Sequence, residues 1–303
     1  MPERIPFSGN PLDRAANLRR EEAWVEEQLR AGTYRVLPFW RLQALAREGE
    51  AGELLWLDAA VREQLAEDAE LLLLGVHEGV PHFVQDISAL EDPQTALGVT
   101  DAAFADARRI ATALPEGDAG ILAHARALLE WHSRHRFCGS CGAPTQVSWG
   151  GARRVCTSCG AEHFPGPHAV VIMVVWQGDR CLLGRGRGWR PGSYSALAGF
   201  VDLGETIEEA VAREVKEEVG LTVDEVVYHA SQPWPFPMSL MIGCFAHVVD
   251  DEIDVDPEEL AEARWFTRDE IRRAYEAPGE VDFSVPGRIA IAHHLIRDWS
   301  AGT

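Results

Sequence analysis

The chain has 303 residues, of which 46% are hydrophobic and 25% charged, a composition typical of a soluble globular protein and not of a fibrous or disordered one. One hydrophobic core seldom organises this many residues, so two or three domains are expected. The formal net charge of −20 disfavours strong unspecific binding to nucleic acid, because such a surface repels phosphates.

Neither end of the chain suggests export or membrane attachment. The first residues carry charges at once and contain no apolar run of the kind found in secretory signals. The longest relevant apolar run, residues 169–176, is too short to span a bilayer. We therefore expect a cytoplasmic protein without membrane partners.

Residues 1–136 alternate short apolar segments with charged ones and are expected to form an α+β domain. Strands are predicted at residues 34–40, 54–57, 71–76 and 82–85, with a turn at 77–80. A helix is predicted over about 119–135, because Ile121, Ala125, Leu128 and Leu129 recur at helical spacing. The sequence shows no internal repeat, and nothing in this region carries identifiable chemistry.

Residues 137–165 contain two CxxC pairs, Cys138/Cys141 and Cys156/Cys159. Zinc prefers tetrahedral thiolate coordination, and two such pairs on neighbouring turns can supply all four ligands. The spacing predicts a zinc ribbon whose metal is structural, since no coordination position stays open. The alternative of four unliganded cysteines is much weaker. Two further cysteines lie in apolar surroundings and are expected in the core: Cys181 and Cys244.

Residues 166–303 follow a mixed pattern that favours an α/β/α sandwich. Strands are predicted at residues 169–175, 180–183 and 195–201, with a turn at 178–179 and a Gly/Arg-rich loop at 184–192. A helix follows, then two further strands and a C-terminal helix near residues 289–299. The expected organisation is thus three parts, with boundaries after residues 136 and 165.

The segment 199–221 predicts a well-delimited helix. Gly199 and Gly204 permit turns, and Thr206 with Glu209 forms a capping box at the helix start. Gly220 is a natural C-terminal stop. One face is apolar and is expected to pack on the core; its residues are Ile207, Ala210, Val211 and Val215.

Three carboxylates in this helix, Glu214, Glu217 and Glu218, lie at positions i, i+3 and i+4 and should converge on one face. Like charges so placed destabilise a helix, and the helix dipole disfavours anions near the C-terminal end. A bound hard cation, Mg²⁺ or Mn²⁺, would compensate both costs. The alternative is a solvated acidic face.

The same segment satisfies every fixed position of the pattern G-x5-E-x7-R-E-U-x-E-E-x-G-U, with U aliphatic, and so resembles the Nudix hydrolases. The resemblance implies hydrolysis of a nucleoside diphosphate linked to another group, in which divalent cations neutralise phosphate oxygens and activate water. It implies that Glu214 and Glu218 bind metal, and that Glu217 is a third ligand or orients the attacking water. Glu205 and Arg213 are expected to pair.

A proline-rich segment, residues 231–241, follows the box. Its alternating prolines exclude a central strand and predict a stiff extended segment, although an exposed edge or linker is the ordinary alternative. The letters match the SQPWPFPxS motif of the NADH pyrophosphatases among Nudix enzymes. This resemblance implies that the following residues contact a dinucleotide: Gln232, Pro233, Trp234, Pro235, Phe236, Pro237, Met238 and Ser239.

The same resemblance implies further site residues. The carbonyl of Ala198 and the carboxylate of Glu259 would bind the catalytic metal, and Ala292 would contact substrate. Phe200 would stack on a nicotinamide or adenine ring, or else pack in the core. Two positions depart from the family: Phe164 stands where a Tyr is frequent, and Gly151 where some members use a substrate-contacting Glu.

The expected activity is hydrolysis of NAD(H) to NMN(H) and AMP, with Mg²⁺ or Mn²⁺ at the glutamates and structural Zn²⁺ at the cysteines. Other ADP-linked substrates such as ADP-ribose, and the NAD cap of RNA, are alternatives because the bond broken is the same. A zinc-ribbon binding module without activity is the alternative of a different class. The resemblance also implies a homodimer.

Overall fold

The computed structural model describes residues 4–47, 49, 52–62, 69–115 and 117–302. The chain divides into two compact units. As far as described, the C-terminal unit contains residues 4–6, 168–233 and 239–302, and the N-terminal unit contains residues 7–167 and 234–238. No helix among the described residues is long and apolar enough to cross a membrane.

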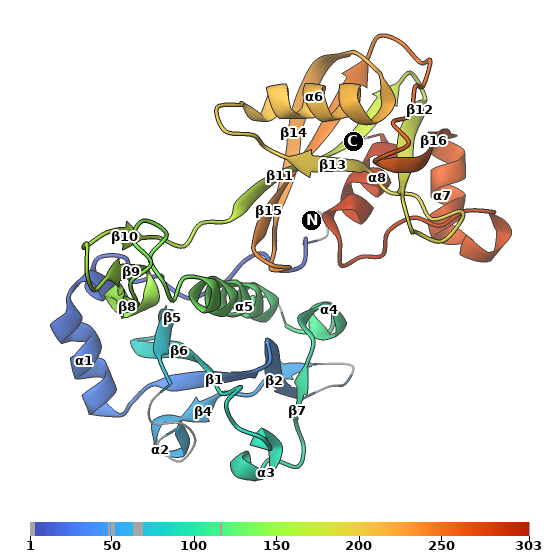
Figure 1. Cartoon of the computed structure of the whole chain (residues 1–303). Helices are drawn as coiled ribbons and strands as arrows, with labels where there is room; N and C mark the ends of the chain where they lie inside the picture. The colour runs from blue at the N-terminus through green and yellow to red at the C-terminus, as the bar shows by residue number, and fades with distance from the viewer. Residues whose placement is uncertain (1–3, 48, 50–51, 63–68, 116, 303) are drawn as a thin grey trace. The chain divides into compact units, whose positions relative to one another are not determined.

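A mixed sheet forms the centre of the C-terminal unit, with strand order β14-β15-β11-β12-β16 and with β13 paired to β11 (Figure 1). The central strand β11 is parallel to β15 and antiparallel to β12 and β13. The strands are β11 (His168–Gln177), β12 (Arg180–Gly186), β13 (Leu197–Phe200), β14 (Val223–Trp234), β15 (Ser239–Val248) and β16 (Leu260–Thr267). The helices are α6 (Ile207–Val219), α7 (Arg268–Glu276), the 3-10 turn η3 (Pro278–Glu280) and α8 (Ile291–Ala301).

Alternate residues of β11 enter two cores, one on each face of the sheet. Val171, Met173 and Val175 pack with the apolar face of α6, whereas Ile172 and Val174 pack with α7 and α8. Because successive side chains of a strand point to opposite faces, a strand covered on both sides must be apolar throughout. The unit is therefore the predicted α/β/α sandwich.

Some predicted elements of this unit need correction. Three strands follow α6 where two are predicted, and α7 is not predicted at all. The edge strand β14 is mostly exposed or half-buried, and α7 buries only Ile271 and Ala274, so neither has a strong apolar pattern. The loop predicted at 184–192 begins later, because residues 184–186 continue β12.

The proline segment is extended only as far as Trp234, the last residue of β14. Residues 235–238 form the tight turn that leads into β15, so the prediction of one stiff extended segment is wrong there. Pro233 is tolerated because β14 lies at the edge of the sheet, where a missing amide donor leaves no ladder bond unmade.

The N-terminal unit has the same strand arrangement, although the sequence shows no repeat. Its sheet order is β3-β2-β1-β6-β5, with β4 paired to β1 and β7 to β2. The central strand β1 is parallel to β6, the second strand of a hairpin, and antiparallel to β2, the next strand along the chain. It is also antiparallel to β4, a short strand before a helix. The central strand of the C-terminal unit has the same three kinds of neighbour. The likeness lies in topology, which two sequences can share without being similar to each other.

The strands of this unit are β1 (Arg35–Trp40), β2 (Gln43–Arg47), β3 (Glu53–Leu54), β4 (Leu57–Asp58), β5 (Leu71–His77), β6 (Val80–Asp86) and β7 (Ala103–Ala105). Its helices are η1 (Leu18–Arg20), α1 (Glu22–Ala31), α2 (Ala59–Arg62), α3 (Pro93–Leu97), α4 (Ala107–Ile110) and α5 (Asp118–Arg134). The predicted hairpin and the predicted long helix are confirmed as β5–β6 and α5. The single strand predicted at 54–57 is wrong, since β3 and β4 are separate and pair with different neighbours.

The cysteine region forms a small sheet in the order β10-β9-β8, from β8 (Thr145–Ser148), β9 (Arg153–Cys156) and β10 (Glu162–His163), with the turn η2 (Trp149–Gly151). A Cβ added at Gly151 would lie 3.0 Å from a Leu72 methyl group of β5. The backbone of Gly151 also has φ +96°, a region that favours glycine. A glutamate at this position would therefore need both strain and movement of β5, which explains the departure from the family.

A buried polar cluster joins this region to α5 and β5. The ring of His132 is oriented to donate from Nε2 to the Gly151 carbonyl (2.9 Å) and to accept at Nδ1 from Arg154 (2.9 Å). Arg154 is 4% exposed and also donates to both carboxylate oxygens of Glu70, at 3.0 and 3.2 Å. Every member of the cluster is thus bonded, which is what burial of such groups requires.

The stability of the N-terminal unit should depend on His132 below neutral pH. Burial, with the charge of Arg154 adding to it, lowers the pKa of His132 to about 4. In the unfolded chain His132 binds a proton near pH 6.5. Its contribution to the free energy of unfolding is therefore complete above that pH and is lost as the pH falls towards 4. We expect urea unfolding to show that the wild type loses about 2 kcal/mol more than His132→Gln between pH 7 and pH 5. Equal losses in the two proteins would contradict this assignment.

Candidate active site

The helix α6 is delimited as its sequence predicts. The Thr206 side chain accepts from the Glu209 amide (3.2 Å), and the Glu209 carboxylate accepts from the Thr206 amide (2.8 Å), so the capping box is complete. Gly220 ends the helix in the left-handed conformation with φ 75°. Because Val211 and Val215 are fully buried on the core side, the rotation of the helix is fixed. That rotation determines where its carboxylates lie.

Two carboxylates of α6 meet a third that is distant in sequence. Oxygens of Glu214, Glu218 and Glu259 lie within 4.8 Å of one another. The loop that carries Glu259 runs along the C-terminal end of α6, held by hydrogen bonds from the Asp254 amide to the Val219 carbonyl and from the Asp256 amide to the Glu218 carbonyl, both 3.0 Å. These three residues are the acidic cluster of the unit.

The acidic cluster fits a divalent cation. Glu218 is 5% exposed, and its Oε2 has no hydrogen-bond partner among the described residues. Burial, together with the charges of Glu214 and Glu259, raises the pKa of Glu218 to about 8, and burial likewise raises that of Glu214. Ionised carboxylates are costly in this arrangement unless a cation binds them, and oxygen donors suit Mg²⁺ or Mn²⁺. This buried oxygen is therefore a donor of the right chemistry for such a cation.

Gly199 makes room for this cluster. It lies within strand β13, so its predicted role in a turn is wrong. An added Cβ would lie 1.8 Å from the carboxyl carbon of Glu214, a distance far too short for two non-bonded atoms. The glycine is required because β13 passes directly against the face of α6 that carries Glu214. The neighbouring Ala198 is exposed, and its backbone hydrogen-bonds Glu218, which opposes part of the rise in the pKa of that residue.

Arg213 connects the loop before α6 to the carboxylates. Its Nε and Nη2 donate to Glu205 at 2.6 and 2.9 Å, and Nη2 also donates to the Phe200 carbonyl at 2.8 Å. The predicted pairing of Glu205 with Arg213 is thus present, and it lowers the pKa of Glu205 to about 2. Nη1 of Arg213 donates to Glu214 and Glu217, both at 2.9 Å.

Glu217 lies on the same face of α6, where Nη1 of Arg213 donates to both Glu214 and Glu217, but it is not one of the three residues of the acidic cluster. Its side chain is 52% exposed and accepts from Arg213. Glu259, expected as a ligand from the family resemblance, does join the cluster; a local helix pattern cannot reveal it because it comes from a separate loop. A role for Glu217 in orienting water stays a prediction.

The residues of the proline motif have diverse environments. Gln232 is fully buried; its Nε2 donates to the carbonyls of Pro6 (3.0 Å) and Ile289 (2.8 Å), and its Oε1 accepts from the Ile291 amide at the start of α8 (2.8 Å). It therefore anchors the start of α8. A substrate contact by this side chain would have to replace one of these bonds.

The aromatic residues of the motif belong to the N-terminal unit. Phe236 lies between the guanidinium groups of Arg108 and Arg126, at 3.6 and 4.7 Å from the ring centre, and Arg126 donates to the Pro235 carbonyl. Trp234 contacts Phe236 edge-on. Pro235 and Met238 are buried, whereas Pro233 is exposed, and Pro237 and Ser239 are half-buried.

Of the remaining predicted substrate residues, the aromatic ones are accessible. Phe200 is 60% exposed and contacts His168 edge-on, so the alternative of core packing is wrong. Phe164 is 52% exposed, in the N-terminal unit, and contacts Trp149. Ala292, in the first turn of α8, is only 3% exposed and packs in the core, where its side chain cannot reach a ligand without movement.

The four predicted zinc ligands converge. Their sulfur atoms all lie within 4.8 Å of one another, with 3.7 Å between Cys138 and Cys159 and 3.4 Å between Cys141 and Cys156. Tetrahedral zinc with four thiolates separates the sulfurs by about 3.8 Å, so the site fits. The backbone amide of Ser140 lowers the pKa of Cys138 to about 5, and backbone amides also lower that of Cys156. Both effects favour the thiolate form that zinc binds.

Loss of this metal should destabilise the N-terminal unit. In Cys156→Ser we expect zinc content, measured by atomic absorption, to fall from one atom per chain to nearly none and the melting temperature to fall by roughly 10 °C. The matched control is Cys244→Ser, which removes a fully buried thiol outside the cluster. Zinc retained by Cys156→Ser, or lost from the control, would contradict the assignment.

Three family models match consecutive parts of the chain. They are an NADH pyrophosphatase-like rudimentary NUDIX domain over residues 33–131, an NADH pyrophosphatase zinc ribbon domain over 133–164, and a NUDIX domain over 166–284. The first of these matches accounts for the strand arrangement that the two units share.

Curated relatives extend the likeness. NudC of Mycobacterium bovis, described as an NAD-capped RNA hydrolase, is 39% identical over 255 residues, which cover 81% of this chain and 80% of that protein. Human NUDT12, described in the same words, is 46% identical over 61% of this chain. Human NUDT13, described as a mitochondrial NAD(P)H pyrophosphatase, is 43% identical over 65% of this chain and 59% of its own length. The chain spans only 42% of the length of NUDT12.

Proposed function

Because the chain belongs to the NADH pyrophosphatase family of Nudix hydrolases, we propose that it hydrolyses the diphosphate bond of NAD(H), giving NMN(H) and AMP. The observation that carries the proposal is the acidic cluster of Glu214, Glu218 and Glu259, in which a buried oxygen of Glu218 has no partner among the described residues. The intact metal-binding carboxylates disfavour the alternative of a zinc-ribbon binding module without activity.

The acidic cluster is proposed to hold Mg²⁺ or Mn²⁺, with the Ala198 carbonyl as a further ligand. A divalent cation there would neutralise phosphate oxygens and acidify the attacking water. Gly199 keeps Glu214 within reach of the cation, and Arg213 holds the loop of Glu205 against the helix. Glu217, half-exposed and paired with Arg213, is proposed to orient water.

Phe200 of the C-terminal unit is proposed to contact the dinucleotide; contacts by Phe164 and by the residues from 232 to 239 are proposals that rest on the family resemblance. Phe200 has the exposed face that stacking on a nicotinamide or adenine ring needs. For Gln232 and Ala292 the burial described above favours an indirect role, through the start of α8.

Removal of the NAD cap from RNA is the second candidate, supported by the descriptions of NudC and NUDT12. It breaks the same bond, so the acidic cluster serves both reactions; ADP-ribose is a third substrate of this chemistry. We further propose a cytoplasmic location and a homodimer. The division into residues 1–136, 137–165 and 166–303 is also a proposal, supported by the matched ranges.

The test is hydrolysis by the purified zinc-loaded protein with Mg²⁺ or Mn²⁺, with products resolved by chromatography. NADH, NAD⁺, ADP-ribose and an NAD-capped RNA are run side by side. Release of NMNH and AMP from NADH is expected, and the ratio of kcat/KM values ranks the substrates. No cleavage of any of the four by folded, zinc-loaded protein would overturn the proposal.

A further inference from the structure

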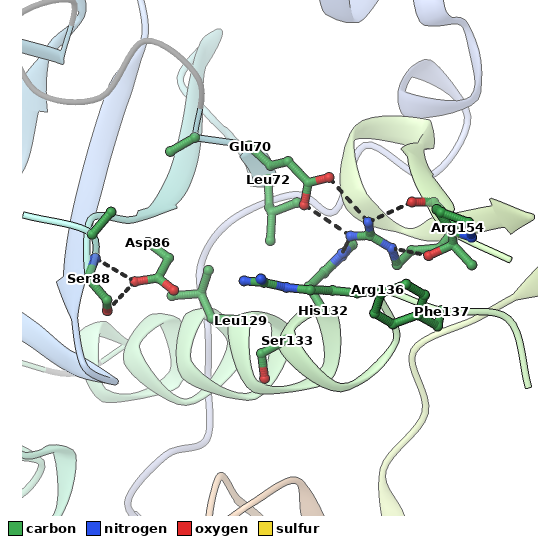
Figure 2. Close-up of a pocket in the computed structure, with 14 residues that line it drawn as sticks. Glu70, Leu72, Asp86, Ser88, Leu129, His132, Ser133, Arg136, Phe137 and Arg154 are labelled. Atoms are coloured by element: carbon green, nitrogen blue, oxygen red, sulfur yellow. Dashed lines mark hydrogen bonds and ion pairs between the residues drawn. The ribbon is translucent and has the colours of Figure 1, made fainter. Parts of the chain in front are cut away.

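A pocket of about 610 Å³ lies within the N-terminal unit, among the start of β5, the end of β6, the end of α5 and the ribbon (Figure 2). This size suits a ligand as large as a mononucleotide. Leu72 and Leu129 supply an apolar part of its lining, and Phe137, 66% exposed, supplies an aromatic ring. The acidic cluster is in the other unit, and none of the predicted metal or substrate residues lines this pocket.

The charged groups of the pocket fall into two kinds. Arg154 is bonded to Glu70, to Thr145 and to His132, so its charge and its donors are committed to the fold. Arg136 differs: among the described residues its guanidinium has no hydrogen bond or ion pair, and Figure 2 shows its side chain reaching into the pocket. A guanidinium without such partners offers a planar set of donors that matches a phosphate.

An acceptor lies at the far side of the same pocket. Asp86 accepts through Oδ1 from the amide (2.9 Å) and the hydroxyl (2.5 Å) of Ser88, which fixes its orientation. Its Oδ2 has no partner among the described residues and remains available. A carboxylate oxygen of this kind pairs well with the vicinal hydroxyls of a ribose.

The geometry points to a binding site for a 5′-mononucleotide in this pocket, with Arg136 binding the phosphate, Asp86 the ribose hydroxyls and Phe137 the base. Each part of the ligand meets a group of complementary chemistry: an unpaired guanidinium, a free carboxylate oxygen and an exposed ring beside an apolar lining. The site rests on these groups alone and does not depend on the proposed hydrolysis.

Photolabelling of the full zinc-loaded chain with 8-azido-AMP tests this inference, in buffer without Mg²⁺ or Mn²⁺. Peptide mapping should place label on residues 129–145, and excess AMP but not inorganic phosphate should prevent it. Arg136→Gln should weaken AMP competition at this site by about tenfold, and Asp86→Asn should also weaken it. Label confined to the C-terminal unit would overturn the site, and equal protection by phosphate would show a simple anion site instead.

The matched control is Arg134→Gln, which removes an exposed arginine two residues away that does not line the pocket and pairs with Glu130 at 2.5 Å. Labelling of residues 129–145 should be unchanged in this variant. Equal loss in Arg134→Gln and Arg136→Gln would mean that general surface charge, and not the pocket, attracts the nucleotide. NADH hydrolysis, followed in parallel, reports separately on the proposed function.

Discussion

Glu218→Gln should lower the rate of NADH hydrolysis by roughly 10³-fold or more, with zinc content and fold intact. The substitution keeps the shape of the side chain but removes the charge that binds the cation. The buried Oε2 of Glu218 has no other partner among the described residues, so no neighbouring group can replace the lost charge at this position. Because burial raises the pKa of Glu218 to about 8, an ionised carboxylate is already unfavourable in the metal-free protein. The variant should therefore be at least as stable as the wild type without metal, and gain less stability from added Mn²⁺.

Steady-state kinetics, metal titration by calorimetry and thermal melts with and without Mn²⁺ check this result. Glu208→Gln is the matched control: it makes the same chemical change on the same helix, at an exposed position in the first turn. Its kcat should stay within about twofold of the wild type, as expected for a surface substitution. A Glu218→Gln enzyme with a tenth of the wild-type rate or more would contradict the assignment of Glu218 as a metal ligand.

Local rules predict α6 well because its determinants lie within one helix. The capping box of Thr206 and Glu209, the stop at Gly220 and the apolar face are properties of short windows, and the structure has all of them. The four cysteines are predictable for a similar reason, since each CxxC pair lies on one tight turn. The strand β11 is equally predictable from the sequence, because burial on both faces requires a continuous apolar run.

Tertiary placement explains what the sequence leaves open. Glu259 is expected as a ligand only from the family resemblance: it enters the acidic cluster through backbone hydrogen bonds of residues 254 and 256 to the end of α6, and no spacing rule relates these segments. Gln232 shows the same limit: its place in a substrate motif suggests a ligand contact, yet its hydrogen bonds are to Pro6, Ile289 and Ile291. The shared topology of the two units is likewise carried by strand pairing, which very different sequences can satisfy.

Gly199→Ala should reduce hydrolysis by about 10²-fold or more, although it adds a single methyl group. The added carbon would occupy the place of the Glu214 carboxyl group, 1.8 Å from its carbon atom. Either Glu214 turns away from Glu218 and Glu259 or β13 moves off α6, and both displace a metal-binding oxygen. We expect a large fall in kcat and weaker Mn²⁺ binding by calorimetry.

A second variant separates displacement of Glu214 from general damage to the fold. Gly199→Ala combined with Glu214→Asp shortens the carboxylate side chain and removes the clash, so it should bind Mn²⁺ more tightly than Gly199→Ala alone. Gly279→Ala is the control for the glycine change itself, since an added Cβ there meets nothing within 4 Å. Wild-type Mn²⁺ affinity in Gly199→Ala would show that the cluster tolerates the methyl group, and that contact between β13 and α6 does not set the position of Glu214.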